Sequence, residues 1–171
     1  MKTKFKKIIP ISEIAHVQML CNLLDMILTP ENTPPDCPKE IFEQYFVFAC
    51  IWAFGSCLFQ DQLRDHRADF SNWWINEFKT IKLPSQGTIF DYYIDSETKK
   101  FEPWQNLVPK FELDPELPLQ ATLVHTPETI RIRYFLDNFV QATKPIMLVG
   151  HAGVGKTVLV QEKLKSLSQV I

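Results

Sequence analysis

Residues 145–160 read Pro-Ile-Met-Leu-Val-Gly-His-Ala-Gly-Val-Gly-Lys-Thr-Val-Leu-Val, an apolar run followed by a glycine-rich loop and a helical pattern. Gly150, four further residues and then Gly155-Lys156-Thr157 satisfy the pattern G-x-x-x-x-G-K-[ST]. The loop glycines, among them Gly153, carry no Cβ, so the loop can adopt positive φ angles and turn its backbone N–H groups toward phosphate oxygens. A helix that begins near Gly155 would direct its free N–H groups and positive dipole end at the same phosphates. The stretch therefore predicts a nucleotide-binding P-loop.

The alternative is a glycine-rich turn that binds nothing. A chance match in a chain of this length is expected in about one per cent of cases or fewer. The flanks also fit a P-loop, because residues 146–149 are typical of a buried parallel strand. The residues after the loop suit an amphipathic helix, with apolar side chains at Val158, Leu159, Leu164 and Leu167. His151 either touches the nucleotide or faces solvent, and solvent is favoured because such a loop binds through its backbone.

The candidate ligands are ATP or ADP with Mg²⁺. Lys156 is expected to reach the β- and γ-phosphates, and the Thr157 hydroxyl is expected to bind Mg²⁺. No residue is assigned a catalytic role. The full set of candidate cofactor-binding residues is Gly150, Ala152, Gly153, Val154, Gly155, Lys156, Thr157 and Val158.

Composition indicates a globular protein without a nucleic-acid surface. The 171 residues are 46% hydrophobic and 22% charged, with a formal net charge of −2. Only residues 2–7 are locally basic, and this run is too short to indicate nucleic-acid binding. The four cysteines lack C-x-x-C spacing and nearby histidines, so we expect reduced, mostly buried thiols in an intracellular protein.

Residues 45–59 are almost wholly apolar, so a membrane helix is the alternative to a buried core helix. The run is shorter than the ~20 residues that cross a bilayer. Amphipathic segments flank it on both sides, which favours a core helix. The start of the chain has no apolar run long enough for a signal peptide. No membrane association is therefore expected.

The first half of the chain predicts three helices. Ser12 is expected to cap the first, which ends near Leu28 before a proline-rich stretch. The second contains residues 45–59, and the third spans residues 61–80, with His66 on its surface because it has no second ligand at helical spacing. The side chains expected to be buried are Ile14, Val17, Cys21, Leu24 and Leu28, flanked by Leu20, Leu23 and Ile27, on the first helix, and Leu63, Phe70, Trp74, Phe78 and Ile81 on the third.

A β-hairpin and a linker follow. Residues 88–94 and 99–104 are rich in β-branched and aromatic residues and flank a polar turn. Residues 109–118 contain three prolines among acidic residues, so we place a domain boundary near Val108. Aromatic residues of the hairpin region, Tyr92, Tyr93 and Trp104, are expected to pack against helices rather than to stack nucleic-acid bases, because no basic residues accompany them.

The remaining segment predicts the opening of a wound α/β domain. Thr126-Pro127 is a strong helix start, with apolar residues at helical spacing from Ile132 to Val140. The order helix, strand, P-loop, helix then gives an α/β fold class overall: a mainly helical domain with a hairpin over residues 1–108, followed by the first elements of a P-loop domain over residues 109–171. His125 either lies near a bound base or is an ordinary loop histidine, and both readings stay open.

Four stretches together resemble axonemal dynein heavy chains over nearly the whole sequence: Thr29-Pro-Glu-Asn-Thr-Pro-Pro-Asp-Cys-Pro38, Phe46-Val-Phe-Ala-Cys-Ile-Trp-Ala-Phe-Gly55, Thr98-Lys-Lys-Phe-Glu-Pro-Trp104 and Ile130-Arg-Ile-Arg-Tyr-Phe135. The chain is similar to the segment that leaves the second AAA+ module through its helical lid and enters the third module. The resemblance implies that the P-loop residues, Gly150 to Thr157, form an ATP or ADP site that tunes the motor. At His151 related sequences often have asparagine.

The resemblance also implies a cellular context. The parent protein is a microtubule motor of the ciliary or flagellar axoneme, located in the cytoplasm and cytoskeleton. Its partners would be the neighbouring AAA+ modules of the ring and, through the parent chain, intermediate chains, light chains and the microtubule, with no nucleic acid and no membrane. An alternative role is a non-catalytic helical fragment that binds or regulates other parts of the motor ring.

Hydrolysis by this chain alone is not expected. A P-loop ATPase needs an acidic residue on a neighbouring strand and an arginine finger. Neither can be identified before Ile171, so the chain resembles a truncated part of the ATPase module. A single parallel strand would also lack a partner and leave its edges exposed.

Overall fold

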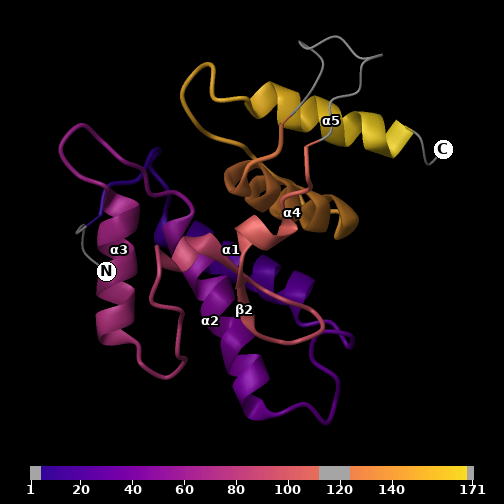
Figure 1. The fold of residues 1–171 in the computed structure, drawn as a ribbon. Helices are drawn as coiled ribbons and strands as arrows, with labels where there is room; N and C mark the ends of the chain where they lie inside the picture. The colour runs from indigo at the N-terminus through magenta and orange to yellow at the C-terminus, as the bar shows by residue number, and fades with distance from the viewer. Residues whose placement is uncertain (1–4, 112–123, 169–171) are drawn as a thin grey trace. The chain divides into compact units, whose positions relative to one another are not determined.

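The computed structural model describes residues 5–111 and 124–168 (Figure 1). Its elements are α1 (Glu13–Ile27), α2 (Lys39–Gly55), α3 (His66–Glu77), the 3₁₀ turn η1 (Ile89–Asp91), β1 (Tyr92–Ile94), β2 (Phe101–Pro103), the 3₁₀ turn η2 (Trp104–Leu107), α4 (Pro127–Gln141) and α5 (Lys156–Ser168). The chain divides into two compact units, Met1–Glu102 and Pro103–Ile171, which are described separately below. The predicted boundary near Val108 stays a prediction.

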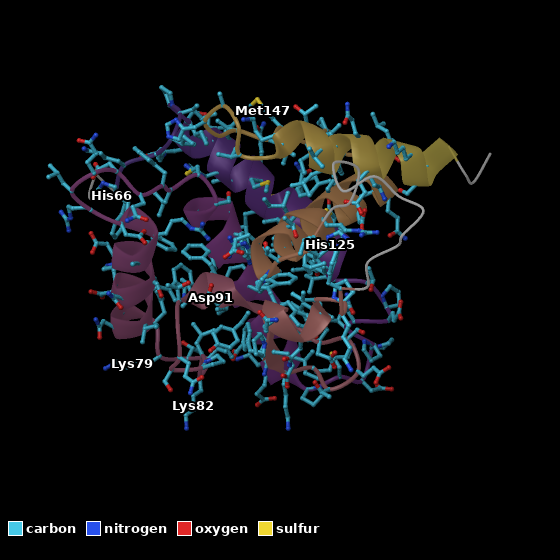
Figure 2. All side chains as sticks on the ribbon, turned by 45° about the horizontal axis from the view of Figure 1, so that its top comes forward. His66, Lys79, Lys82, Asp91, His125 and Met147 are labelled. Atoms are coloured by element: carbon cyan, nitrogen blue, oxygen red, sulfur yellow. The ribbon has the colours of Figure 1, made fainter. Side chains whose placement is uncertain are left out.

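The predicted fold class is confirmed. Three helices and a two-stranded hairpin precede a helix, a glycine loop and a further helix. The predicted strand at residues 146–149 differs: these residues form no hydrogen-bonded strand with any described segment, and Met147, labelled in Figure 2, is 72% exposed. A strand exists only through bonds to a neighbour, and the described residues supply none beside this run.

Helix α1 begins as predicted but buries a different face. The Ser12 hydroxyl accepts a hydrogen bond from the Ala15 N–H at 3.2 Å, which caps the helix. The buried residues are His16, Leu23, Met26 and Ile27. The prediction of the buried face is therefore mostly wrong, because Ile14 and Val17 are 71% and 53% exposed and Cys21 is also exposed.

A buried histidine explains this rotation of α1. Helices α1 and α2 pack side by side (Figure 1). At their interface Nδ1 of His16 lies 2.7 Å from the Ala53 carbonyl oxygen, which can only accept, so Nδ1 donates. This polar contact fixes which face of α1 meets α2, whereas hydrophobic spacing alone permitted a neighbouring face.

Helix α2 is the buried core helix that the sequence predicted, but it ends at Gly55, before the last four residues of the predicted apolar run. Its buried side chains face more than one direction: Tyr45, Phe48, Ala49, Cys50, Ile51, Trp52 and Ala53. Within the described ranges, no helix is long and apolar enough to cross a membrane. Among the cysteines, all free, Cys50 and Cys57 are buried while Cys21 is exposed. Burial raises the pKa of the Cys50 thiol to about 11.

The end of α2 packs directly against aromatic rings. A Cβ on Gly55 would lie 2.5 Å from Cζ of Phe90 and 3.0 Å from Cε1 of Phe70. These two rings are themselves stacked, with centroids 6.0 Å apart, and Trp52 meets the Phe90 ring edge-on at 5.4 Å. Only glycine allows this approach of the helix backbone to the core.

The hairpin forms where it was predicted. The Asp95 carboxylate accepts from the N–H groups of Glu97 and Thr98 at 3.1 and 2.7 Å, which fixes the turn between β1 and β2. Tyr92 and Tyr93 are both buried. The hydroxyl of Tyr92 donates to the Gln86 carbonyl at 2.6 Å.

In the second unit, local hydrogen bonds cap both ends of α4. Thr126 caps its start, as predicted, and its hydroxyl accepts from the Thr129 N–H at 3.3 Å. At the other end, the N–H groups of Thr143 and Lys144 donate to the carbonyls of Val140 and Phe139 at 3.0 and 2.9 Å, and Thr143 has a φ of 54°. This is a Schellman motif with threonine at the left-handed position.

Trp104 of η2 packs on α4. The indole is 1% exposed, and its ring centroid lies 5.2 Å from that of Tyr134 in an edge-on arrangement. The prediction that Trp104 packs the hairpin onto the preceding helices differs from the structure, because its helix is α4 of the second unit.

Candidate functional site

The glycine loop has the backbone that the motif predicts. Gly153 and Gly155 have φ angles of 80° and 82°, in the left-handed region that favours glycine. A Cβ on Gly150 would lie 3.2 Å from Cγ2 of Val154, a tight contact within the loop. Helix α5 begins at Lys156, directly after the second left-handed glycine. The free N–H groups at the N-terminus of α5 therefore lie directly at the end of the glycine loop.

The ammonium group of Lys156 lies over the start of the loop. Its Nζ donates to the carbonyl oxygens of Gly150 and His151 at 2.9 and 2.7 Å. The contact brings one positive charge next to the backbone of the loop. A cation in this place is suited to an anion that approaches the loop from outside.

The other candidate residues line an open surface. Thr157, Val158 and Val154 are exposed, as are Ala152, Gly153 and Gly155, whereas Gly150 is half-buried. The His151 side chain is exposed as well. Their contact with a nucleotide stays a prediction.

The residues present fit a phosphate group together with Mg²⁺. Two glycines with positive φ, a lysine ammonium and the N-terminus of α5 meet in one loop, and the Thr157 hydroxyl supplies one oxygen for a metal. Magnesium bound with a nucleotide takes most of its ligands from phosphates and water, so one protein hydroxyl is compatible with it. The described residues hold no cluster of three or more His, Cys, Asp or Glu side chains that could bind a metal ion without phosphate.

Helix α5 is supported by α4, which lies beside it (Figure 1). Leu159 of α5 and Leu136 and Phe139 of α4 are buried at 6%, 5% and 3% exposure. His125, just before α4, has its Nε2 3.6 Å from Oε1 of Glu162 on α5. The sequence left the role of His125 open, and its observed partner is a carboxylate of the P-loop helix.

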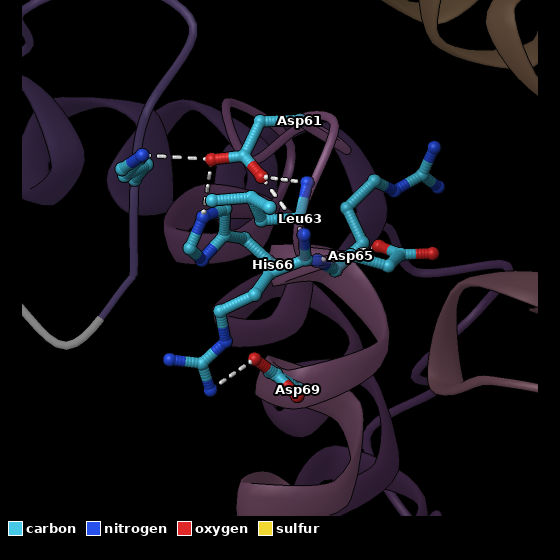
Figure 3. Close-up of polar contacts among 8 residues, drawn as sticks. Asp61, Leu63, Asp65, His66 and Asp69 are labelled. Atoms are coloured by element: carbon cyan, nitrogen blue, oxygen red, sulfur yellow. Dashed lines mark hydrogen bonds and ion pairs between the residues drawn. The ribbon is translucent and has the colours of Figure 1, made fainter.

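A second polar cluster surrounds Asp61 in the first unit (Figure 3). Its Oδ2 accepts from Nζ of Lys6 at 2.7 Å and lies 3.4 Å from Nε2 of His66. Its Oδ1 accepts from the N–H groups of Leu63 and Arg64 at 2.9 and 2.8 Å. The hydrogen bond from Lys6, followed by those from the two N–H groups, lowers the pKa of the Asp61 carboxyl far below its usual range.

This cluster corrects the prediction for His66. His66 was predicted to lie on the surface of a helix over residues 61–80, but it is only 3% exposed. Helix α3 begins only at His66, because Asp61 bonds the chain into a turn and Asp65 caps the helix through the N–H groups of Arg67 and Ala68. Leu63, predicted to be buried, is 90% exposed on the same turn, whereas Phe70 and Trp74 are buried as predicted.

Comparison with known proteins gives a consistent result over both parts of the chain. The family profile described as "Dynein heavy chain AAA lid domain" matches residues 1–106. The profile described as "P-loop containing dynein motor region" matches residues 111–171. The two matches correspond in order to the helical part and the P-loop part, and the second implies nucleotide binding.

Individual relatives agree. The chain is 64% identical over 169 residues to "Dynein beta chain, ciliary" of Heliocidaris crassispina, covering 99% of this chain and 4% of the relative. It is 66% identical over 167 residues to "Dynein axonemal heavy chain 9" of Homo sapiens, covering 98% and 4%. It is 65% identical over 164 residues to "Dynein axonemal heavy chain 17" of Mus musculus, covering 96% and 4%. The chain thus spans a twenty-fifth of the length of these relatives, and it belongs to the axonemal dynein heavy chain family.

Proposed function

We propose that this chain binds ATP or ADP with Mg²⁺ through residues 150–158. The observation that supports the proposal is the backbone of the loop: Gly153 and Gly155 are left-handed and α5 begins at Lys156. The loop N–H groups and the α5 N-terminus would hold phosphate oxygens through backbone atoms. The match to the P-loop dynein motor region supports the same assignment.

Lys156 and Thr157 have separate roles in this proposal. The ammonium group of Lys156 would exchange its two loop carbonyls for β- and γ-phosphate oxygens, which are stronger partners because they are charged. The hydroxyl of Thr157 would bind Mg²⁺, which supplies charge neutralisation between the phosphates when bound. Ala152, Val154 and Val158 would contribute through their backbone.

Titration of a fluorescent ATP analogue tests the proposal. We expect the 171-residue chain to bind it and Lys156→Ala to weaken binding by about ten- to a hundredfold, as for loss of one charge-assisted contact. The matched control is Lys165→Ala, which removes an ammonium group from the last turn of the same helix. Equal affinities of Lys156→Ala and wild type would refute the site.

At larger scale, we propose that residues 1–108 form the lid of one AAA+ module and residues 109–171 the start of the next. These would be the second and third modules of a ciliary motor. Its partners would be neighbouring modules of the ring, and intermediate chains, light chains and microtubules through the parent chain. Its location would be the axoneme. The two family profiles support the order of lid and P-loop domain, and the words ciliary and axonemal in the names of the relatives support the location.

We also propose that this chain alone does not hydrolyse ATP. Hydrolysis requires an acidic residue beside the P-loop and an arginine finger, and the described residues after the loop form only α5. A phosphate-release assay decides the matter. Release above background that disappears in Lys156→Ala would show that a catalytic group is present after all.

A second candidate function is a non-catalytic interaction module of the motor ring. An apolar groove of about 460 Å³ in the first unit favours it. Phe46 and Phe78 on its rim are 50% and 45% exposed, and Trp73 and Phe54 also line it. Binding of the ATP analogue distinguishes the two candidates, since a pure interaction module would show none.

A further inference from the structure

Two pairs of opposite charge face each other where α4 packs on α5. Nη1 of Arg133 donates to Oε1 of Glu162 at 3.1 Å, and Nζ of Lys163 lies 2.7 Å from Oδ1 of Asp137. Within α4, Nε of Arg133 lies 3.7 Å from Oδ2 of Asp137, so the two pairs are connected. We call these four residues the α4–α5 clasp.

Within the clasp, the carboxylate of Glu162 has two partners. Its Oε1 is approached by Arg133 and also by Nε2 of His125, at 3.6 Å. His125, labelled in Figure 2, precedes the cap of α4, and its side chain is 16% exposed. One carboxylate of α5 therefore meets both the body of α4 and the residue before its N-terminus.

Apolar contact between the two helices is limited. Among the described side chains of α5, Leu159 is the only buried one, while Val158, Val160 and Leu164 are 47%, 37% and 59% exposed. Hydrophobic burial has no direction, so the burial of Leu159 does not by itself fix the rotation of α5 about its axis. The charges are directional, because a rotation that brought Glu162 to Asp137 would place like charges together.

Lys163 of the clasp lies on the same face of α5 as the P-loop lysine, because it follows Lys156 by seven residues, about two turns. Glu162 follows Leu159 by three residues and lies on the adjoining face. At a rise of 1.5 Å per residue, the clasp lies roughly 10 Å along the helix from Lys156. A rigid helix transmits its rotation over this distance, so the clasp also determines where Lys156 and Thr157 point.

We propose that the α4–α5 clasp is a positioning device for the P-loop, which sets the rotation of α5 and thereby aims the Lys156 ammonium and the Thr157 hydroxyl at phosphate and Mg²⁺. The inference rests on the proposed nucleotide binding. Arg133 and Glu162 are 44% and 33% exposed, and exposed ion pairs contribute little to stability. The clasp therefore acts on orientation more than on folding.

A double-mutant cycle in the 171-residue chain tests this. Arg133→Gln, Glu162→Gln and the double variant keep side-chain size while removing charge. We expect each single variant to bind the fluorescent ATP analogue roughly two- to fivefold more weakly, with a smaller gain in affinity on adding Mg²⁺. The double variant should lose less affinity than the two single losses combined, because both single variants remove the Arg133–Glu162 pair. Glu128→Gln, an exposed carboxylate in the first turn of α4, is the control and should bind as wild type.

Hydrogen exchange without nucleotide separates failure of this inference from failure of nucleotide binding. The amides of residues 156–163 should exchange faster in both single variants, with unchanged circular dichroism. Unchanged exchange, additive losses of affinity, or faster exchange with wild-type affinity would each overturn the inference. If the wild type itself binds no analogue, the proposed function and the positioning role both fail, and exchange then reports only on helix packing. If Glu162→Gln loses helical signal, Asp137→Asn and Lys163→Gln form the replacement cycle, because their side chains pair at 2.7 Å.

Discussion

At the scale of single residues, two glycines in this chain are required for different physical reasons. Gly155 needs its backbone angle, since its φ is 82° and no atom lies within 4 Å of an added Cβ. Gly55 needs its lack of volume, because an added Cβ would meet two buried aromatic rings. Substitution at the first should affect ligand binding, and at the second it should affect stability.

Gly155→Val should weaken nucleotide binding more than Lys156→Ala does. A β-branched residue at positive φ costs on the order of 1–3 kcal/mol, and its side chain would also stand where phosphate approaches the loop. Titration of the fluorescent ATP analogue measures the change. His151→Asn is the control, because an exposed side chain should matter little. If His151→Asn changes affinity more than Lys156→Ala does, the histidine contacts the ligand and its assignment to solvent is wrong.

Gly55→Ala should destabilise the first unit. Its Cβ would overlap Phe90 at 2.5 Å, and overpacking costs about 1–3 kcal/mol, which exceeds the gain of about 1 kcal/mol from alanine helix propensity. Thermal unfolding followed by circular dichroism should show a lower midpoint. Ser56→Ala, the exposed neighbour, should leave the midpoint unchanged. An unchanged midpoint for Gly55→Ala would mean that the rings move aside freely.

At the scale of elements, side chains next to α1, α3 and α4 fix where these helices start. Ser12, Asp65 and Thr126 each accept backbone hydrogen bonds at a helix start. Of these three starts, that of α3 differs from prediction, because Asp61 organises the preceding turn. The end of α4 instead uses a left-handed threonine, which is a strained choice.

Thr143→Gly should stabilise the chain by about 1 kcal/mol, because glycine adopts the left-handed angle of the Schellman motif without a Cβ clash. Urea unfolding monitored by circular dichroism measures the difference. Thr143→Ala keeps a Cβ at the same angle and should bring no comparable gain. Equal gains from both substitutions would show that strain at this position is not the cause.

Asp61→Asn should lower the stability of the first unit at pH 7 and reduce its sensitivity to acid. The pKa of the folded carboxyl lies below that of the unfolded chain, near 3.9, so its contribution is present above that value and is lost as pH falls toward the folded pKa. The urea unfolding midpoint should therefore differ most from wild type at pH 7 and 5, and the difference should begin to narrow at pH 4 and 3. Asp36→Asn, an exposed carboxyl, serves as control. A constant difference across this range would contradict the assignment.

At the scale of the whole molecule, the chain has two compact units with separate cores. The first is built on Phe48, Phe70 and Phe90, and the second on Trp104, Leu136 and Phe139. Trp104 belongs by packing to the second unit although it directly follows the hairpin. A unit that is separated from the other should therefore stay folded if it contains all of its own core residues.

A fragment of residues 1–108 should be helical, with Trp52 and Trp74 protected from acrylamide quenching, because their partners lie within the fragment. Trp104 should be quenched freely, since its partner Tyr134 is absent from the fragment. Comparing the fragment with its Trp104→Phe variant isolates this signal. A random-coil spectrum, or full quenching of every tryptophan, would show that the first unit does not fold alone.

The sequence by itself determined the P-loop, the starts of α1 and α4, the hairpin and the family. These features depend on residues close together in the chain, such as Gly150 to Thr157, or on matches over its whole length. Only the tertiary structure decided which face of α1 is buried, that His66 is covered, and that Arg133 and Asp137 meet Glu162 and Lys163. Hydrophobic spacing defines several neighbouring faces equally well, and a single buried hydrogen bond, such as that from His16 to Ala53, selects one of them.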